Sequence, residues 1–236
     1  MMAARRFFEP IYDVETGDLL RAAEALVSTR GLVARVPGGV VTLDALIALA
    51  ASEGLHRAKP EKAVADLPII GGRVGAARVL SHYVARGCKY ALTQRGALTP
   101  RSIYAAIALH PAEVAARATP PAVAAPNTTL RGALNRMRER GSICAFIVRA
   151  GRLKGVVDAW TILGEAVRRG EEGLEASCSS FASADALVST LDELAKPLAK
   201  HGFAAALVAG RPLLIDDVSL HRALVASAEL WLQRVR

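Results

Sequence analysis

Four glycines recur along the chain at nearly equal intervals, and each follows an amphipathic stretch that predicts a helix. They are Gly31, Gly87, Gly141 and Gly202, so the intervals are 56, 54 and 61 residues. Glycine tolerates the left-handed backbone that commonly ends a helix. Each glycine is followed by a short apolar strand, a turn, a second strand and an apolar helix; the first strands read LVARV, CKYALTQ, SICAFIV and FAAALVA. A single unit of this size cannot bury its apolar face, so the sequence predicts a fold built from packed repeats.

The unit is clearest in its third copy. Asn127 or Thr128 is expected to cap the first helix, since a side-chain oxygen there can accept bonds from the unpaired amides of the first turn. Gly141 is expected to end that helix. Two short strands separated by a turn follow, and a second helix is predicted at residues 159–168.

This unit resembles the cystathionine-β-synthase (CBS) domain, which is built as strand–helix–strand–strand–helix. The third copy carries the best match, where GRLKGVVDAWTIL is similar to the family segment g-x-l-x-G-x-v-t-x-x-D-i-l. The resemblance covers nearly the whole chain and implies an α/β (α+β) fold of four copies, at about 8–53, 58–109, 120–170 and 174–236. The family usually pairs copies about a pseudo-two-fold axis, which implies two paired modules, 1–117 and 118–236.

A proline-rich stretch marks the expected boundary between the two modules. Three prolines lie within seven residues there, and proline cannot continue a helix, so the boundary is placed near 117–121. Ala122–Val123 is expected to form the leading strand of the third copy. In the fourth copy, an apolar stripe predicts a first helix that contains Leu187, Leu191, Leu194 and Leu198. Pro197 lies near the end of this predicted helix.

The composition is that of a globular protein with aliphatic cores, since hydrophobic residues make up 52% of the chain and aromatic residues only 5%. The formal net charge of +8 favours polyanions and nucleotides as partners. Only two Asn and two Gln occur, which is typical of a heat-adapted protein from a thermophile.

Cysteine spacing and hydropathy bear on the compartment. The three cysteines, Cys88, Cys144 and Cys178, are widely separated and indicate small buried side chains rather than disulfides or a metal site. The sequence shows neither a signal-peptide pattern nor an apolar stretch of membrane-spanning length. We expect a cytoplasmic protein that does not contact a membrane.

Catalytic patterns are weak. The five histidines are scattered without metal-ligand spacing, and no serine nucleophile motif occurs. The adjacent carboxylates Asp216–Asp217 precede a predicted helix, where capping explains them. The sequence therefore predicts a protein that is not an enzyme, with no metal site and no required cofactor.

The resemblance implies where a ligand would bind. In the CBS family, a T-x-x-D segment before the last helix of the unit binds phosphate through its Thr and ribose through its Asp. Thr99 keeps the phosphate-side role in copy two, Ser102 replaces the Asp, and Arg101 could add positive charge. The roles look exchanged in copy three and the spacing differs in copy one; the remaining candidates are Asp158 and Thr161, Asp216 and Ser219, and Thr42 and Asp44. Each of these residues also has a purely structural explanation as a helix cap.

The function implied is regulatory. Paired copies would bind an adenine nucleotide (AMP, ADP or ATP) or S-adenosylmethionine in their clefts and signal to an unidentified protein partner, with a homodimer as one arrangement. Two alternatives stay open at this point. One is a nucleic-acid-binding protein that uses its basic surface, and the other is a structural module that takes no ligand.

Overall fold

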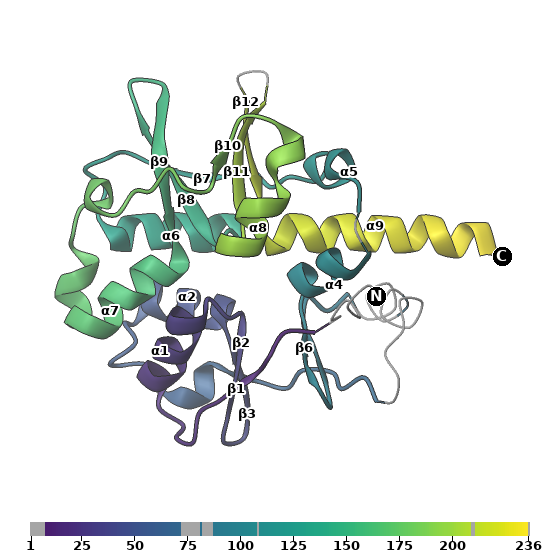
Figure 1. The fold of residues 1–236 in the computed structure, drawn as a ribbon. Helices are drawn as coiled ribbons and strands as arrows, with labels where there is room; N and C mark the ends of the chain where they lie inside the picture. Colours follow the sequence, from purple (N-terminus) through teal and green to yellow (C-terminus); the bar gives the residue numbers. More distant parts are fainter. Residues whose placement is uncertain (1–7, 72–80, 82–86, 108, 209–210, 236) are drawn as a thin grey trace.

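Figure 1 shows the computed structural model of the chain, which describes residues 8–71, 81, 87–107, 109–208 and 211–235. Helices alternate with several small sheets, so the predicted mixed α/β class is confirmed. The helix predicted before Gly87 falls mostly outside the described residues.

Copy one has the expected order of strand, helix, two strands and helix. Its elements are β1 (Tyr12–Asp13), α1 (Leu19–Thr29), β2 (Val33–Val36), β3 (Gly39–Thr42) and α2 (Leu43–Ser52). A short 3-10 turn (Pro60–Lys62) and the strand β4 (Val64–Ala65) follow, and β4 joins the same sheet in the order β1-β2-β3-β4. Asp18 begins α1 by accepting a bond from the Leu20 amide at 2.9 Å.

In copy two the described elements are β5 (Ala91–Thr93), β6 (Gly96–Leu98) and α4 (Pro100–Ile107). In place of a leading strand, Ile69 forms one parallel bridge with Leu92. Proline at the first position of α4 fits a helix start, because the amide that it lacks would have no partner there.

Copy three follows a short helix, α5 (Pro111–Ala115), and matches the expected order. Its elements are β7 (Ala122–Ala124), α6 (Leu130–Arg140), β8 (Cys144–Arg149), β9 (Arg152–Asp158) and α7 (Ala159–Leu174). The leading strand at Ala122–Val123 is confirmed. The predicted cap is wrong by one position, because Thr129 accepts the bond from the Gly132 amide at 3.1 Å.

Copy four differs more from expectation. After a 3-10 turn (Cys178–Ser180), its elements are β10 (Leu187–Val188), a second 3-10 turn (Leu191–Glu193), α8 (Ala195–His201), β11 (Ala204–Val208), β12 (Arg211–Ile215) and α9 (Asp217–Val235). The predicted helix through Leu187 is therefore wrong at its start, because Leu187 pairs with Ala205 in a parallel strand. Pro197 consequently lies in the first turn of α8, where helices tolerate proline.

Helices of the two halves of the chain pack on each other (Figure 1). Helix α1 packs against α7, α2 against α6, and α4 against α9. The largest core cluster accordingly contains residues of both halves, among them Leu26, Leu46, Leu134 and Trp160. Copies one and three thus share one apolar core, whereas smaller clusters lie around α4, α5, α8 and α9.

Each half begins with a segment that crosses between two copies. Glu9 bridges Ala97 of β6, in copy two, before β1 joins copy one. Thr119 likewise bridges Leu214 of β12 in copy four before β7 joins copy three. We call residues 8–10 and 118–120 the leading segments. They tie each pair of copies together through backbone hydrogen bonds.

Candidate functional site

The predicted site residues lie at the starts of the last helices of the four copies. Thr42, Thr99, Asp158 and Asp216 stand directly before or at the beginning of α2, α4, α7 and α9. Each side chain accepts a bond from an amide three residues on; in the same order these amides belong to Ala45, Ser102, Thr161 and Ser219, at 3.2, 3.1, 2.8 and 3.0 Å. All four residues therefore act as helix caps.

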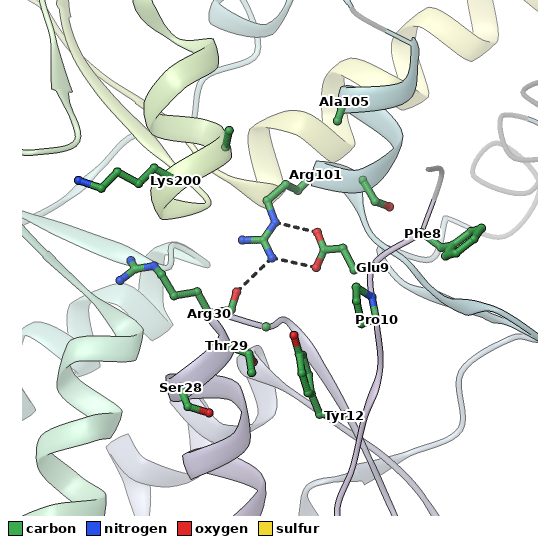
Figure 2. A pocket seen from close by; sticks show the side chains of 13 residues that line it. Phe8, Glu9, Pro10, Tyr12, Ser28, Thr29, Arg30, Arg101, Ala105 and Lys200 are labelled. Carbon is green, nitrogen blue, oxygen red and sulfur yellow. Dashed lines mark hydrogen bonds and ion pairs between the residues drawn. The ribbon is translucent and has the colours of Figure 1, made fainter. Parts of the chain in front are cut away.

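The copy-two residues carry further bonds, to a residue far away in the sequence. Thr99 is fully buried, and its hydroxyl donates to Glu9 Oε1 at 2.8 Å. Arg101 donates from Nε and Nη2 to the two oxygens of Glu9, at 2.7 and 2.8 Å (Figure 2). Burial acts to lower the pKa of Arg101, but its bonds to Glu9 outweigh burial and the pKa is raised. Three donated bonds therefore hold one carboxylate at the start of α4.

A pocket of about 570 Å³ opens beside this carboxylate (Figure 2). It lies among the first leading segment, the end of α1, the first turn of α4 and the end of α8. Three basic side chains line it, those of Arg30, Arg101 and Lys200, and Glu9 is its acidic residue. The pocket therefore combines positive charge with the amide end of a helix, which together favour an anion.

A second, apolar pocket of about 290 Å³ adjoins the first. The two share Arg101, Ala105 and Ala199, so they meet along the groove between α4 and α8. The other lining residues of the second pocket are mainly apolar: Tyr104, Leu109, Pro111, Ala195 and Leu198. The groove therefore suits a ligand with a negatively charged group, which the basic pocket would bind, and an apolar group, which the second pocket would bind.

Arg30 joins three copies at the centre of the molecule. Its Nη2 donates to Asp158 Oδ2 at 2.7 Å and to the His201 carbonyl at 3.2 Å. Its guanidinium carbon lies 4.7 Å from the centre of the Trp160 ring, within cation–π range. The indole nitrogen of Trp160 donates to the Gly31 carbonyl at 3.0 Å. The copy-three candidate Asp158 is therefore engaged in a contact between copies, and Thr161 lies half-buried beside it.

The other two candidate pairs lie in different surroundings. Asp216 and Ser219 are fully buried, and the Ser219 hydroxyl donates to Asp216 Oδ1 at 2.7 Å. Thr42 is buried at its cap, and Asp44 forms an ion pair with Lys89 at 2.5 Å. The structure thus places Arg101 and Ser102 on the wall of a pocket, with Thr99 buried beside them and bonded to Glu9, whereas Asp216 and Ser219 bond chiefly to each other.

A buried charge cluster was not predicted from the sequence. Lys89 lies between Asp44 and Asp217, at 2.5 and 2.6 Å, and the Tyr90 hydroxyl donates to Asp217 at 2.6 Å. Burial raises the pKa of Asp217, but the charge and hydrogen bond of Lys89 and the bond from Tyr90 outweigh it, so the pKa is lowered. Burial together with the charge of Asp217 raises the pKa of Asp216 to about 6. The adjacent carboxylates were the one sequence signal, and they pointed only to capping.

Other candidate chemistry is sparse in the described part of the chain. Among the described residues, no group of His, Cys, Asp or Glu side chains could hold a metal ion. Cys144 and Cys178 are buried thiols, as expected, and Cys88 is half-buried. No helix within the described ranges combines the length and the hydropathy needed to cross a bilayer.

Comparison with known proteins gives a family match for one part of the chain and a fold for nearly all of it. The CBS domain family model matches residues 113–168, which include most of copy three. No curated protein matches the chain in sequence.

Two solved structures resemble the whole chain in fold. One is a Methanocaldococcus jannaschii protein described as a proposed archaeal homologue of g-AMPK; it is 11% identical with a TM-score of 0.68, covering 91% of this chain and 96% of that one. The other is an uncharacterized conserved protein from Pyrococcus horikoshii, 15% identical with a TM-score of 0.54, covering 94% and 98%.

The two likenesses agree with the architecture. The matched residues contain the unit of helix α6, strands β8 and β9 and most of helix α7, in which the expected order of elements is found. The fold likeness extends over both halves of the chain. Residues 113–168 therefore resemble the CBS domain, and nearly the whole chain shares the fold of these two solved structures.

Proposed function

We propose that this protein is a non-catalytic regulator that binds an adenine nucleotide in the pocket at the start of α4. The observation that carries the proposal is the set of three basic side chains, Arg30, Arg101 and Lys200, around a pocket of about 570 Å³. The start of α4 adds the positive end of a helix dipole, which suits a phosphate group. The description of one fold relative as a proposed homologue of g-AMPK supports the regulatory class.

The adjoining apolar pocket supports a nucleoside rather than a bare anion. An adenine ring needs an apolar slot and a few polar groups at its edge. Tyr104, Leu109 and Leu198 supply apolar surface, and Arg101 lies where the two pockets meet. The phosphate would then lie in the basic pocket and the base in the apolar one. Because α4 and α8 belong to different halves of the chain, ligand binding would alter contacts between the halves and so signal to a protein partner.

Calorimetric titration tests this function. AMP, ADP, ATP, S-adenosylmethionine and a short DNA duplex would be titrated at low and high salt. We expect saturable binding of an adenine compound that persists at high salt. Binding of DNA alone, lost steeply with salt, would instead favour the nucleic-acid alternative. If no compound gives heat on titration, the remaining alternative is a structural module that takes no ligand.

A matched pair of variants locates the site. Lys200 lines the basic pocket, whereas Lys196, on the same helix, does not line it and borders only a neighbouring pocket that Lys200 also borders. We expect Lys200→Ala to weaken nucleotide binding about threefold to fivefold, since an exposed ion pair contributes up to about 1 kcal/mol. Lys196→Ala removes the same charge and should leave the affinity unchanged. Equal effects of the two substitutions would show that the ligand responds to net charge rather than to this pocket.

A further inference from the structure

The anion position at the start of α4 is filled by the protein itself. The carboxylate of Glu9 accepts bonds from Thr99 Oγ1, Arg101 Nε and Arg101 Nη2, at 2.8, 2.7 and 2.8 Å (Figure 2). Both side chains of the ion pair are about four-fifths buried, with exposed fractions of 19% for Glu9 and 20% for Arg101. These are the donors that a phosphate group would use, and bidentate arginine pairs suit either anion.

The backbone of the first leading segment is held less extensively. Glu9 exchanges two hydrogen bonds with Ala97, at 2.8 and 2.9 Å, and this is an isolated bridge rather than part of a ladder. Gly96 permits the approach, because a Cβ there would collide with the Glu9 carbonyl oxygen. Regular strand pairing starts only at Tyr12 in β1. The contact between this segment and copy two therefore depends on one bridge and on the Glu9 carboxylate.

In the equivalent contact in the other half of the chain, the hydroxyl and the carboxylate are on opposite partners. Thr119 forms the bridge to Leu214, and its hydroxyl donates to Asp216 at 3.3 Å. There the hydroxyl belongs to the leading segment and the carboxylate to the helix cap. An incoming anion would be repelled by that fixed carboxylate, whereas in the first half the carboxylate belongs to the segment that can move away.

We propose that Glu9 is a tethered competitor of the ligand's phosphate group, so that phosphate binding at Thr99 and Arg101 displaces the Glu9 carboxylate and releases residues 8–10 from β6. This inference rests on the proposed function, and it describes how nucleotide binding in that pocket would be regulated. Arg101 Nε, Arg101 Nη2 and Thr99 Oγ1 already donate to Glu9, so a phosphate that used the same donors would have to replace that carboxylate, and its charge would be repelled by Glu9 beside it. Occupation by Glu9 lowers the fraction of molecules able to bind the ligand, and the observed affinity falls by that fraction. By reciprocity, a bound phosphate weakens the contact of the leading segment to the same extent.

Titration of pyrophosphate and AMP into three proteins tests the competition: the unaltered chain, Glu9→Gln and Asp13→Asn. Asp13 is the matched control, since it pairs with Arg35 at the surface and its change alters net charge by the same amount. We expect Glu9→Gln to bind pyrophosphate about tenfold more tightly, because a charge-assisted bond is replaced by a neutral one. Asp13→Asn should change the affinity less than twofold.

The outcomes separate this inference from the proposed function. If the unaltered chain binds AMP and Glu9→Gln binds both probes no more tightly, Glu9 is no competitor, although the protein still takes a nucleotide. If none of the three proteins binds either probe, both ideas are wrong.

Hydrogen exchange on the unaltered chain gives a second test that needs no variant. The amides of Glu9 and Ala97 bond across the bridge. We expect both amides to exchange faster when pyrophosphate is bound, while the paired amides of β2 and β3 keep their rates. Unchanged or slower exchange at Glu9 and Ala97 in the bound protein would overturn the proposal.

Discussion

At the scale of single residues, the molecule depends on charges buried between copies. Lys89 neutralises two carboxylates at once, Asp44 from copy one and Asp217 from copy four. Asp217 is fully buried and also accepts a bond from Tyr90. A buried carboxylate without its cation is costly, because neither water nor another charge compensates it. This one lysine therefore links three copies electrostatically.

We expect Lys89→Met to reduce the free energy of unfolding by about 3–5 kcal/mol at pH 7, the usual cost of stranding one partner of a buried ion pair. Urea denaturation measures it. The folded-state pKa of Asp217 is lowered, so the ion pair stabilises the fold above the unfolded pKa of about 4 and loses this contribution as the pH falls below it. The difference between variant and unaltered protein should therefore shrink as the pH falls below about 4.

The control for this prediction is Lys62→Met. Lys62 pairs with Glu53 at the surface, with half of its side chain exposed. Its loss should change stability by less than about 1 kcal/mol. Similar losses in the two variants would show that burial of the Lys89 cluster adds nothing.

At the scale of helices and strands, the ends of the elements decide how the copies meet. Gly202 follows α8 with φ of +78°, and Gly141 follows α6 with φ of +63°. Nothing lies within 4 Å of a Cβ placed at Gly141. A Cβ at Gly202 would collide with Arg101 Nη1 and lie 3.1 Å from Trp160 Cη2. Both glycines end a helix, but only one also leaves room for a neighbouring copy.

We expect Gly141→Ala to cost about 1 kcal/mol, the strain of a left-handed backbone for a residue with a Cβ. Gly202→Ala should cost at least about 1 kcal/mol more, because Arg101 is held by Glu9 and cannot move without breaking those bonds. Urea denaturation of the two variants measures the difference. Equal losses would mean that Arg101 adjusts freely.

The same elements show how far the sequence determines the fold. The repeat predicted the order of elements that copies one and three show, and the caps at Thr42 and Thr99 were correctly placed because their chemistry is local. The end of α1 was not: Arg30, rather than Gly31, takes the left-handed backbone with φ of +51°. Its guanidinium is fixed by Asp158 and Trp160, and such contacts between distant residues offset local backbone preference.

Contacts between distant residues also explain two further features that the sequence did not predict. Leu187 follows a helical apolar spacing, yet it forms a strand because it pairs with β11. Of the residues that line the basic pocket, the sequence singled out only Arg101 and Ser102, since its other cations come from α1 and α8. No local pattern reports that Glu9 reaches Arg101, because the contact spans most of the first half of the chain.

At the scale of the whole molecule, the core crosses the boundary that was expected between modules. Helices α1 and α2 precede residue 117, yet they pack against α7 and α6 of the other half. Buried side chains from both sides form one cluster. The division into modules 1–117 and 118–236 stays a proposal, and the packing couples the two halves whichever copies are paired.

We expect the amides of α1, α2, α6 and α7 to share one free energy of opening in native-state hydrogen exchange, because separating them would expose their common core. Mass spectrometry of peptides from each helix at increasing denaturant measures it. Earlier exchange of α1 and α2, with α6 and α7 still protected, would show instead that the halves open independently.

The first leading segment carries a carboxylate and the second a hydroxyl, and this difference decides which half of the chain each segment can pair with. Glu9 meets a hydroxyl at Thr99, and Thr119 meets a carboxylate at Asp216. If the segments changed places, Glu9 would face Asp216 in a buried setting, and two acids would confront each other where one bond now forms. Thr119 would meanwhile leave Arg101 without its acid. Each leading segment is therefore chemically matched to the helix start in its own half of the chain. The two segments could not exchange places without an unfavourable contact between two carboxylates.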